Sequence, residues 1–203
     1  MIWGWVSQLA DTRELVVVSS REGLRRWLAD NCASGSSVWL VRPRKGEVGH
    51  IPVREISQEL LCWGWIDSAV RKHDTTSSLL LISPRKSGSA WSGLNKRLVE
   101  AARREGAMTP AGEAAIERAK ADGSWSFLDD VEALVVPDDL GLALRDANAM
   151  ANWDDFPPSS RRGILEWIKT AKRPETRNRR VAETARLAAR NIRALSPGAK
   201  TAS

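Results

Sequence analysis

Residues 52–70, PVREISQELLCWGWIDSAV, contain the change from helix to strand on which the fold depends. Proline suits the first turn of a helix, and apolar residues then follow at helical spacing: Val53, Ile56, Leu60 and Trp63. Gly64 ends this helix, because glycine readily adopts the backbone conformation at which helices stop. A strand is therefore predicted to begin at Trp65.

The stretch after this glycine predicts two antiparallel strands. Residues 65–70 and 78–83 form the strands, and the polar residues 73–76 lie between them. A turn near Asp74 joins the strands most simply. This arrangement places three charged residues around one small sheet: Asp67, Asp74 and Arg85.

The N-terminal residues predict two further strands and a helix. One strand is expected over residues 15–18, and another over residues 38–41, which are short, rich in Val and bounded by Ser and Pro. Between them, Ser19 or Ser20 is placed to cap a helix over residues 21–30.

The rest of the chain predicts successive helices. The first is capped by Ser89 or Ser92 and stops at Gly106. Others are expected over residues 110–121, 126–134, 137–148, 149–156 and 158–171. After Pro174, a long helix is expected to pack through apolar residues at steps of four and three: Val181, Ala185, Ala188, Ile192 and Leu195.

These elements indicate an α+β fold, with a small mixed or antiparallel sheet and helices, followed by a mostly helical C-terminal half. We expect residues 1–106 to form the sheet-containing region with the candidate site. Residues 107–203 are expected to form a helical region packed on it. A chain of 203 residues suffices for one sizeable core, so one compact unit is predicted.

The composition is that of a globular domain, with 42% apolar and 28% charged residues. No apolar run approaches the roughly 20 residues that span a bilayer, and the N-terminus lacks the pattern of a secretory signal. Cys32 and Cys62 are too few for a disulfide framework and are expected to be reduced. A cytoplasmic location is therefore expected.

Charge is distributed unevenly along the chain. Of the net charge of +6, residues 157–203 contribute +9, from 12 Lys and Arg against three Glu, which leaves −3 for residues 1–156. Four arginines are predicted to share a face of the last helix: Arg179, Arg186, Arg190 and Arg193. Such a face binds nucleic acid or an acidic partner, or it is simply solvated.

The candidate site combines carboxylates with an arginine. Asp67 or Asp74 beside Arg85 would hold the guanidinium in place or act as a proton acceptor in catalysis. The alternatives are that Asp67 forms an ion pair at the sheet edge and that Asp74 only shapes its turn.

An anion site is predicted at the start of the helix that follows the hairpin. Backbone N–H groups near Asn95 and the hydroxyls of Ser89 and Ser92 would accept an anion, while Arg85 and Lys86 supply positive charge. The alternative is that one serine only caps the helix and that the basic pair is solvated.

Two further pairs would complete a pocket. Trp65 and Trp91 are candidate walls for a flat ligand, or ordinary core residues. Lys172 and Arg177, near the start of the last helix, would reach the first site and close it. Their alternative is a helix junction locked by a hydrogen bond between a glutamate and an arginine, with the remaining arginines solvated.

Several classes of site find no support in the sequence. His50 and His73 stand in no HExxH or paired Cys/His spacing, so no metal site is predicted. No Gly-rich nucleotide loop occurs, and no cofactor is predicted. Cys62 has no neighbouring base in the sequence that would activate it as a nucleophile.

Short motifs run along nearly the whole chain: Arg26-Trp27-Leu28, Val38-Trp39-Leu40, Leu61 to Asp67, Pro84-Arg85-Lys86, Trp91-Ser92, Gly106 to Gly112, Gly123-Ser124-Trp125 and Glu175-Thr176-Arg177. Together they resemble the YdeI/OmpD-associated family, also called bacteriocin-protection proteins. The resemblance implies a mixed α/β domain with a small sheet and a helical C-terminal half. It carries no catalytic residue over to this chain.

The leading functional hypothesis is a cytoplasmic, bacterial-type stress or protection protein that binds a small anionic or aromatic ligand between the sheet and the helical half. The first alternative is an enzyme that uses the same pocket, with Asp67 or Asp74 as general acid/base and Arg85 stabilising negative charge. The second alternative is nucleic-acid binding by the basic last helix.

Overall fold

The computed structural model describes residues 11–196, which divide into a unit that ends at Trp125 and a unit that begins at Ser126. This boundary lies beyond the predicted one after residue 106, because the helix that begins at Pro110 packs on the first unit. A sheet lies in the N-terminal half and the rest is mostly helical. The predicted α+β class is therefore confirmed.

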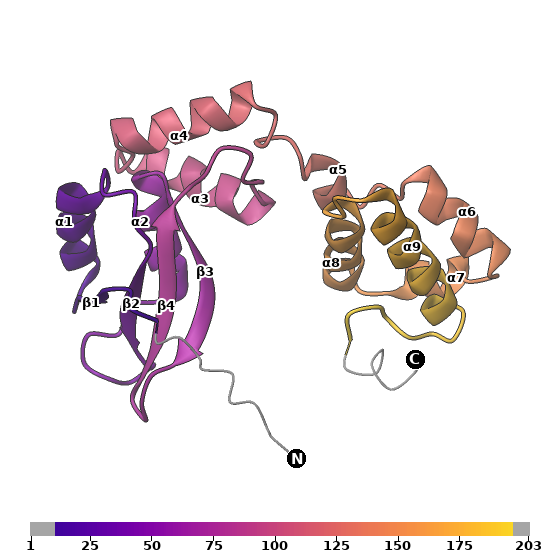
Figure 1. The fold of residues 1–203 in the computed structure, drawn as a ribbon, viewed down its shortest axis with the longest axis horizontal. Helices are drawn as coiled ribbons and strands as arrows, with labels where there is room; N and C mark the ends of the chain where they lie inside the picture. The colour runs from indigo at the N-terminus through magenta and orange to yellow at the C-terminus, as the bar shows by residue number, and fades with distance from the viewer. Residues whose placement is uncertain (1–10, 197–203) are drawn as a thin grey trace, which may run out of the picture. The chain divides into compact units, whose positions relative to one another are not determined.

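The sheet has the strand order β1-β2-β4-β3 (Figure 1). Its strands are β1 (Leu15–Val17), β2 (Val38–Pro43), β3 (Trp65–Lys72) and β4 (Ser77–Pro84). β1 is parallel to β2 and the other neighbours are antiparallel, so the sheet is mixed. The predicted hairpin is confirmed, with Trp65 opposite Pro84 and an irregular register between Asp67 and Val70.

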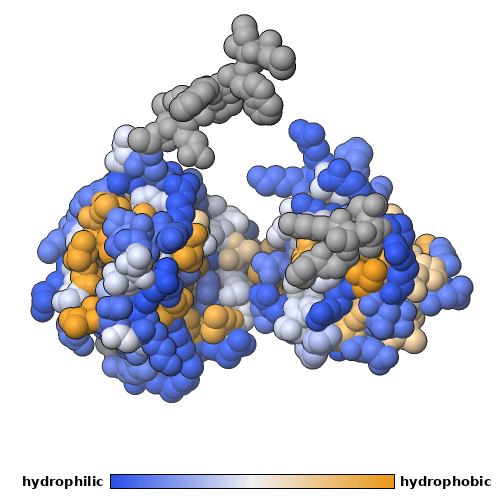
Figure 2. All heavy atoms as spheres, turned by 90° about the horizontal axis from the view of Figure 1, so that it is seen from below, coloured by the Kyte–Doolittle hydropathy of each residue, from blue (hydrophilic) through white to orange (hydrophobic). Residues whose placement is uncertain are grey.

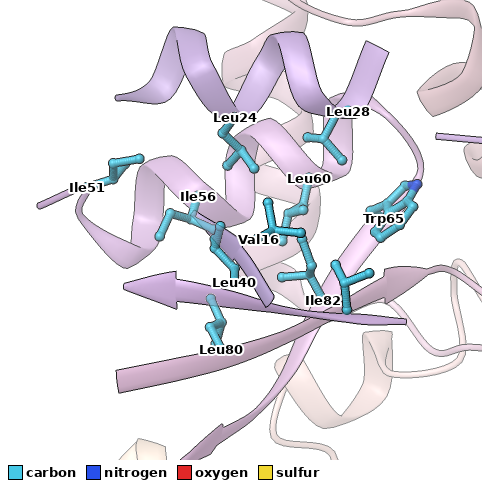
Figure 3. Packing of buried hydrophobic residues seen from close by; sticks show 11 residues of the cluster. Val16, Leu24, Leu28, Leu40, Ile51, Ile56, Leu60, Trp65, Leu80 and Ile82 are labelled. Atoms are coloured by element: carbon cyan, nitrogen blue, oxygen red, sulfur yellow. The ribbon is translucent and has the colours of Figure 1, made fainter. Parts of the chain in front are cut away.

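Helices α1 (Arg21–Asn31) and α2 (Val53–Cys62) cover one face of the sheet (Figure 3). Ser20 caps α1 by accepting the N–H of Gly23, as predicted. Helices and strands meet in one cluster of buried apolar side chains: Val16, Leu24, Leu28, Val38, Leu40, Ile51, Ile56, Leu60, Trp65, Leu80 and Ile82. This core fixes the ends of β3 and β4, and Arg85 directly follows β4.

Helices α3 (Gly93–Arg104) and α4 (Pro110–Ala121) complete the described part of the first unit. A second buried cluster joins them to the end of α2 and includes Leu61, Trp91, Leu98 and Ile116. Thr109 caps α4 and donates its hydroxyl to the carbonyl oxygen of Cys62, 2.6 Å away. Gly112 lies so close to this carbonyl that a Cβ atom would overlap it. The start of α4 is thereby fixed against the end of α2.

The described part of the second unit consists of helices α5 (Asp129–Glu132), α6 (Asp138–Asp146), α7 (Met150–Asp155), α8 (Pro158–Lys169) and α9 (Pro174–Ala188). α9 packs on α6, α7 and α8. Helix α5 is shorter than the predicted helix over residues 126–134. Residues 126–128 form a turn, and Leu134 adopts a left-handed conformation with φ of 56°.

Helix α9 is also shorter than the sequence predicts. Asn191 adopts a left-handed conformation with φ of 55°. Its N–H and that of Ile192 donate to the carbonyl oxygens of Ala188 and Leu187, which is the Schellman pattern of a helix end. The last two residues of the predicted apolar stripe, Ile192 and Leu195, therefore lie beyond the end of the helix.

The predicted face of four arginines is wrong for the same reason. Arg179 and Arg186 lie on α9, whereas Arg190 and Arg193 follow its end. The four arginines do not lie on one helix, so they do not form the continuous basic helix face that was predicted as a nucleic-acid surface.

Hydrophilic residues cover most of the visible surface of each unit, with apolar patches between them (Figure 2). Large exposed apolar side chains include Leu15 and Val17 on β1 and Val135 and Leu142 in the second unit. Scattered exposure of this kind is normal for a globular protein. Between residues 11 and 196, no helix has both the length and the apolar character of a membrane span.

Candidate functional site

Two charged residues in the described part of the first unit are buried, Glu59 and Arg85, and Glu59 is ion-paired with Arg21 and Arg25. Only 8% of Arg85 is exposed. It directly follows β4, and its N–H donates to the carbonyl oxygen of Gly64, 2.8 Å away. Gly64 has a φ of 72° and forms the turn between α2 and β3. The turn that the sequence predicts at this glycine therefore also positions the arginine.

The guanidinium of Arg85 has only part of its hydrogen-bonding capacity used. Its Nη2 donates to the carbonyl oxygens of Ala90 and Ser89, at 2.8 and 3.3 Å. Its Nε and Nη1 are buried and have no hydrogen-bond partner in the described structure. Burial lowers the pKa of Arg85 to about 10, although the carboxylate of Asp67 opposes this change. Arg85 is thus still charged at neutral pH.

Trp91 supports the guanidinium from one side. The guanidinium carbon lies 3.8 Å from the centre of the Trp91 ring, which is a close cation–π contact. Trp91 is buried and packs at 5.0 Å on Trp125, and the Nζ of Lys96 lies 5.1 Å from the Trp125 ring. The two indoles are tilted by 50° to each other, and each has a cation over its ring.

A small cavity adjoins Arg85 within the first unit. It is lined by Arg85, Lys86, Ser87, Trp91, Ala115, Arg118, Ala119, Asp122 and Ser124. The space open to the centre of a water molecule is about 10 Å³, roughly what one water requires. Three lining side chains are cationic and one is a carboxylate, so the cavity has a net positive charge that favours an anion.

Asp122, at the C-terminal end of α4, is the carboxylate of this cavity. It accepts hydrogen bonds from the hydroxyl of Ser87 at 2.6 Å, the N–H of Gly88 at 2.8 Å and the N–H of Ser124 at 2.9 Å. Hydrogen bonds from Ser124, Ser87 and Gly88 hold the pKa of Asp122 well below its usual range. Its charge is therefore used to hold the loop that follows Arg85.

Asp67 lies near Arg85, as the hairpin predicts. It is half-buried on β3, opposite Ile82, and accepts a hydrogen bond from the hydroxyl of Ser57 at 2.9 Å. Its charge acts on Arg85 as an electrostatic attraction. Asp67 is thus the carboxylate that a proton-transfer role at this site would use.

The structure does not bring Asp74 to this site. Asp74 lies in the β3–β4 turn, at the opposite end of β4 from Arg85. Its carboxylate accepts from the N–H groups of Thr76 and Ser77 at 2.8 and 2.6 Å. Hydrogen bonds from Ser77 and Thr76 lower the pKa of Asp74 to about 2. These contacts are those of a residue that shapes its turn.

The other predicted site residues of the first unit have structural contacts. Trp65 is fully buried in the sheet core, packs edge-on against Trp27 and donates its Nε1–H to the carbonyl oxygen of Cys32. Ser92 caps α3 by accepting the N–H of Asn95, whose side chain is half-buried. Ser89 contributes its carbonyl oxygen to Arg85.

Lys172 and Arg177 belong to the second unit. Lys172 is exposed before α9. Arg177 donates through Nε and Nη2 to the carboxylate of Asp139 on α6, at 2.7 and 2.9 Å. This ion pair joins two helices of the second unit, and its acceptor is an aspartate of α6 rather than the glutamate that the alternative of a locked helix junction expects.

Sequence reasoning missed the residues that α4 contributes to the cavity, chiefly Arg118 and Asp122. The Gly123-Ser124-Trp125 motif was a usable signal, because Asp122 directly precedes it and Trp125 packs on Trp91. Cys62 also lies near α4, but burial raises the pKa of its thiol to about 11, which disfavours a nucleophilic role.

Comparison with family models gives two matches. Residues 133–191 match the family described as "Bacteriocin-protection, YdeI or OmpD-Associated", which confirms the predicted resemblance for the second unit. Residues 16–115, which contain Arg85 and Asp67, match a different model, described as a domain of unknown function (DUF8412). No curated protein and no solved structure matched this chain.

Proposed function

We propose that this chain, whose residues 133–191 match the YdeI/OmpD-associated family, is a cytoplasmic, bacterial-type protection protein that binds a small oxyanion at Arg85 in its first unit. The two free cysteines, Cys32 and Cys62, suit a reducing compartment. The ligand would be a carboxylate or a phosphate, because these groups accept hydrogen bonds from guanidinium donors. The protective role follows the description of the family alone.

The observation that carries this proposal is a buried arginine with two unpartnered nitrogens. Buried polar groups are nearly always hydrogen-bonded, and leaving a charged donor unsatisfied costs more than leaving a neutral one. Nε and Nη1 of Arg85 therefore favour an acceptor that the chain does not supply. An oxyanion in the adjoining cavity would accept hydrogen bonds from these nitrogens, and its negative charge would be attracted by the positive charges of Lys86 and Arg118.

The alternatives have less support. An enzyme would use Asp67, which lies near Arg85, but its carboxylate already accepts a hydrogen bond from Ser57. The arginines of the C-terminal region do not form one helix face. Binding without chemistry is therefore the function that the geometry favours.

The test is thermal unfolding of the purified chain in the presence of phosphate, sulfate, acetate or benzoate at constant ionic strength. A ligand that binds only the folded state stabilises it by about 2.7 kcal/mol at 100 times its Kd. We expect at least one of these anions to raise the Tm of the wild type, and we expect Arg85→Gln to abolish the shift. Arg54→Gln, at the exposed first turn of α2, is the matched control and should keep it.

Asp67→Asn tests in the same experiment whether the neighbouring carboxylate is needed for binding. We expect this variant to keep the anion-dependent shift, because the positive charge at Arg85 remains. Equal shifts for Arg85→Gln and the wild type would show that the anion binds elsewhere. No shift with any of these anions would contradict the proposed anion site.

A further inference from the structure

We propose that the loop of residues 86–90 is a movable cover on the Arg85 site and that the Asp122 carboxylate is the latch that holds it closed. This inference rests on the proposed anion site, since it describes how a ligand would gain access to it. The loop connects β4 to Ser92, the cap of α3, and contains no helix or strand.

The loop is held differently at its two ends. At the outer end, residues 86–88 are exposed, and Ser87 and Gly88 are both bound to one oxygen of Asp122. Gly88 has a φ of 74°, which lets the chain reverse direction there. At the inner end, the carbonyl oxygens of Ser89 and Ala90 accept from buried Arg85. The loop thus covers the guanidinium and is fastened by a residue 34 positions further along the chain.

The closed site is too small for a polyatomic ligand. Its space for the centre of a water molecule is about 10 Å³, which suits one water. An oxyanion with several heavy atoms can enter only if part of the lining moves. Arg85 and Trp91 are buried, and Ala115 and Ala119 belong to α4, so the exposed loop and the exposed side chain of Arg118 are the parts of the lining that can move. The loop is the part that covers the guanidinium.

The contacts at the latch suit reversible opening. Asp122 is exposed, so water can replace its hydrogen bonds to the loop when they break. Opening would release the Ser87 hydroxyl and the Gly88 N–H, which are the donors that an oxyanion needs. In the closed loop these two groups donate to the carboxylate of Asp122, and in the open loop they would be able to donate to an entering anion.

Labelling of arginine by phenylglyoxal tests the latch without any ligand. The rate of modification at Arg85 is measured by mass spectrometry in the wild type, Asp122→Ala, Ser87→Ala and Glu117→Ala. Loss of the two hydrogen bonds should raise this rate about tenfold in Asp122→Ala, given the usual strength of such bonds. Ser87→Ala should give a smaller increase. Glu117→Ala removes an exposed carboxylate from the same helix and should match the wild type.

Equal labelling of Arg85 in all four proteins would overturn the latch. Ser87→Ala leaves the bond from Ser124 to Asp122 intact, so it still reports on the loop if Asp122→Ala fails to fold. Adding phosphate separates the two proposals. Faster labelling without protection by phosphate would support the cover and contradict the phosphate site, whereas protection with unchanged rates would support the site and contradict the latch.

Discussion

Arg85 and Asp74 differ in how many of their polar side-chain atoms have a hydrogen-bond partner. Arg85 is buried with two nitrogens unpartnered, so it is a candidate for binding. Asp74 has backbone donors at 2.6 and 2.8 Å and lies in a turn, so its contacts are those of a residue that shapes the turn. Both residues were candidates for the site because of their residue type. Their hydrogen-bond partners in the structure show which of the two could bind a ligand.

The lowered pKa of Asp74 should make the free energy of unfolding depend on pH in the acidic range. Its pKa is about 2 in the folded chain against an ordinary value of 3.8. A lowered folded pKa means that the stabilisation is complete above about pH 4 and is lost as the pH falls towards 2. We expect Asp74→Ala to lower the free energy of unfolding at pH 7 and to lose this effect near pH 2. Urea unfolding of both proteins across this range measures the difference, and a constant difference would contradict the assignment.

At the scale of helices and strands, the contact between α2 and α4 decides where the candidate cavity forms. The Thr109 hydroxyl and Gly112 both meet the Cys62 carbonyl at the end of α2. Helix α4 continues from this point to Arg118 and Asp122, which line the cavity beside Arg85. A glycine at position 112 is thus a requirement of helix packing.

Gly112→Ala should therefore destabilise the first unit. The new Cβ would overlap the Cys62 carbonyl oxygen, and overpacking of this kind costs about 1–3 kcal/mol. The matched control is Gly163→Ala on α8, where no atom lies within 4 Å of the added Cβ. Since alanine favours helix more than glycine by roughly 1 kcal/mol, the control should be neutral or stabilising. Urea unfolding measures both, and similar effects would contradict the packing argument.

At the scale of the whole molecule, the chain consists of two units with different family matches. The first carries the sheet, the cavity and the match to a domain of unknown function, and the second carries the YdeI/OmpD-associated match. Each has its own buried apolar residues, such as Leu40 and Ile82 in the first unit and Leu144 and Trp153 in the second. Separate cores make separate stabilities possible.

This division predicts that Gly112→Ala affects one unit only. We expect faster hydrogen exchange of backbone amides in the first unit of this variant, with unchanged exchange in the second unit. Hydrogen exchange with peptide-level mass spectrometry measures both units in one sample. Equal acceleration in the two units would show that they unfold as one cooperative body.

The sequence alone was sufficient for the elements whose signals are local. Gly64 separates a helix from a strand, Ser20 caps α1 and Pro110 begins α4 at the predicted residue, because propensity and capping depend on neighbouring positions. The end of α9 was missed, because a left-handed asparagine is a weaker signal than a glycine.

Tertiary structure alone decided the candidate site. The sequence indicated Arg85, Trp91 and Asp67 as candidates, but it gave no sign that two nitrogens of Arg85 would be buried without partners. Nor did it connect Ser87 to Asp122, which lies 35 residues further along the chain. Local patterns specify elements because the residues involved are neighbours in sequence. Burial and hydrogen-bond partnership depend on residues that meet only after the chain has folded, and this is why the site could not be completed from the sequence.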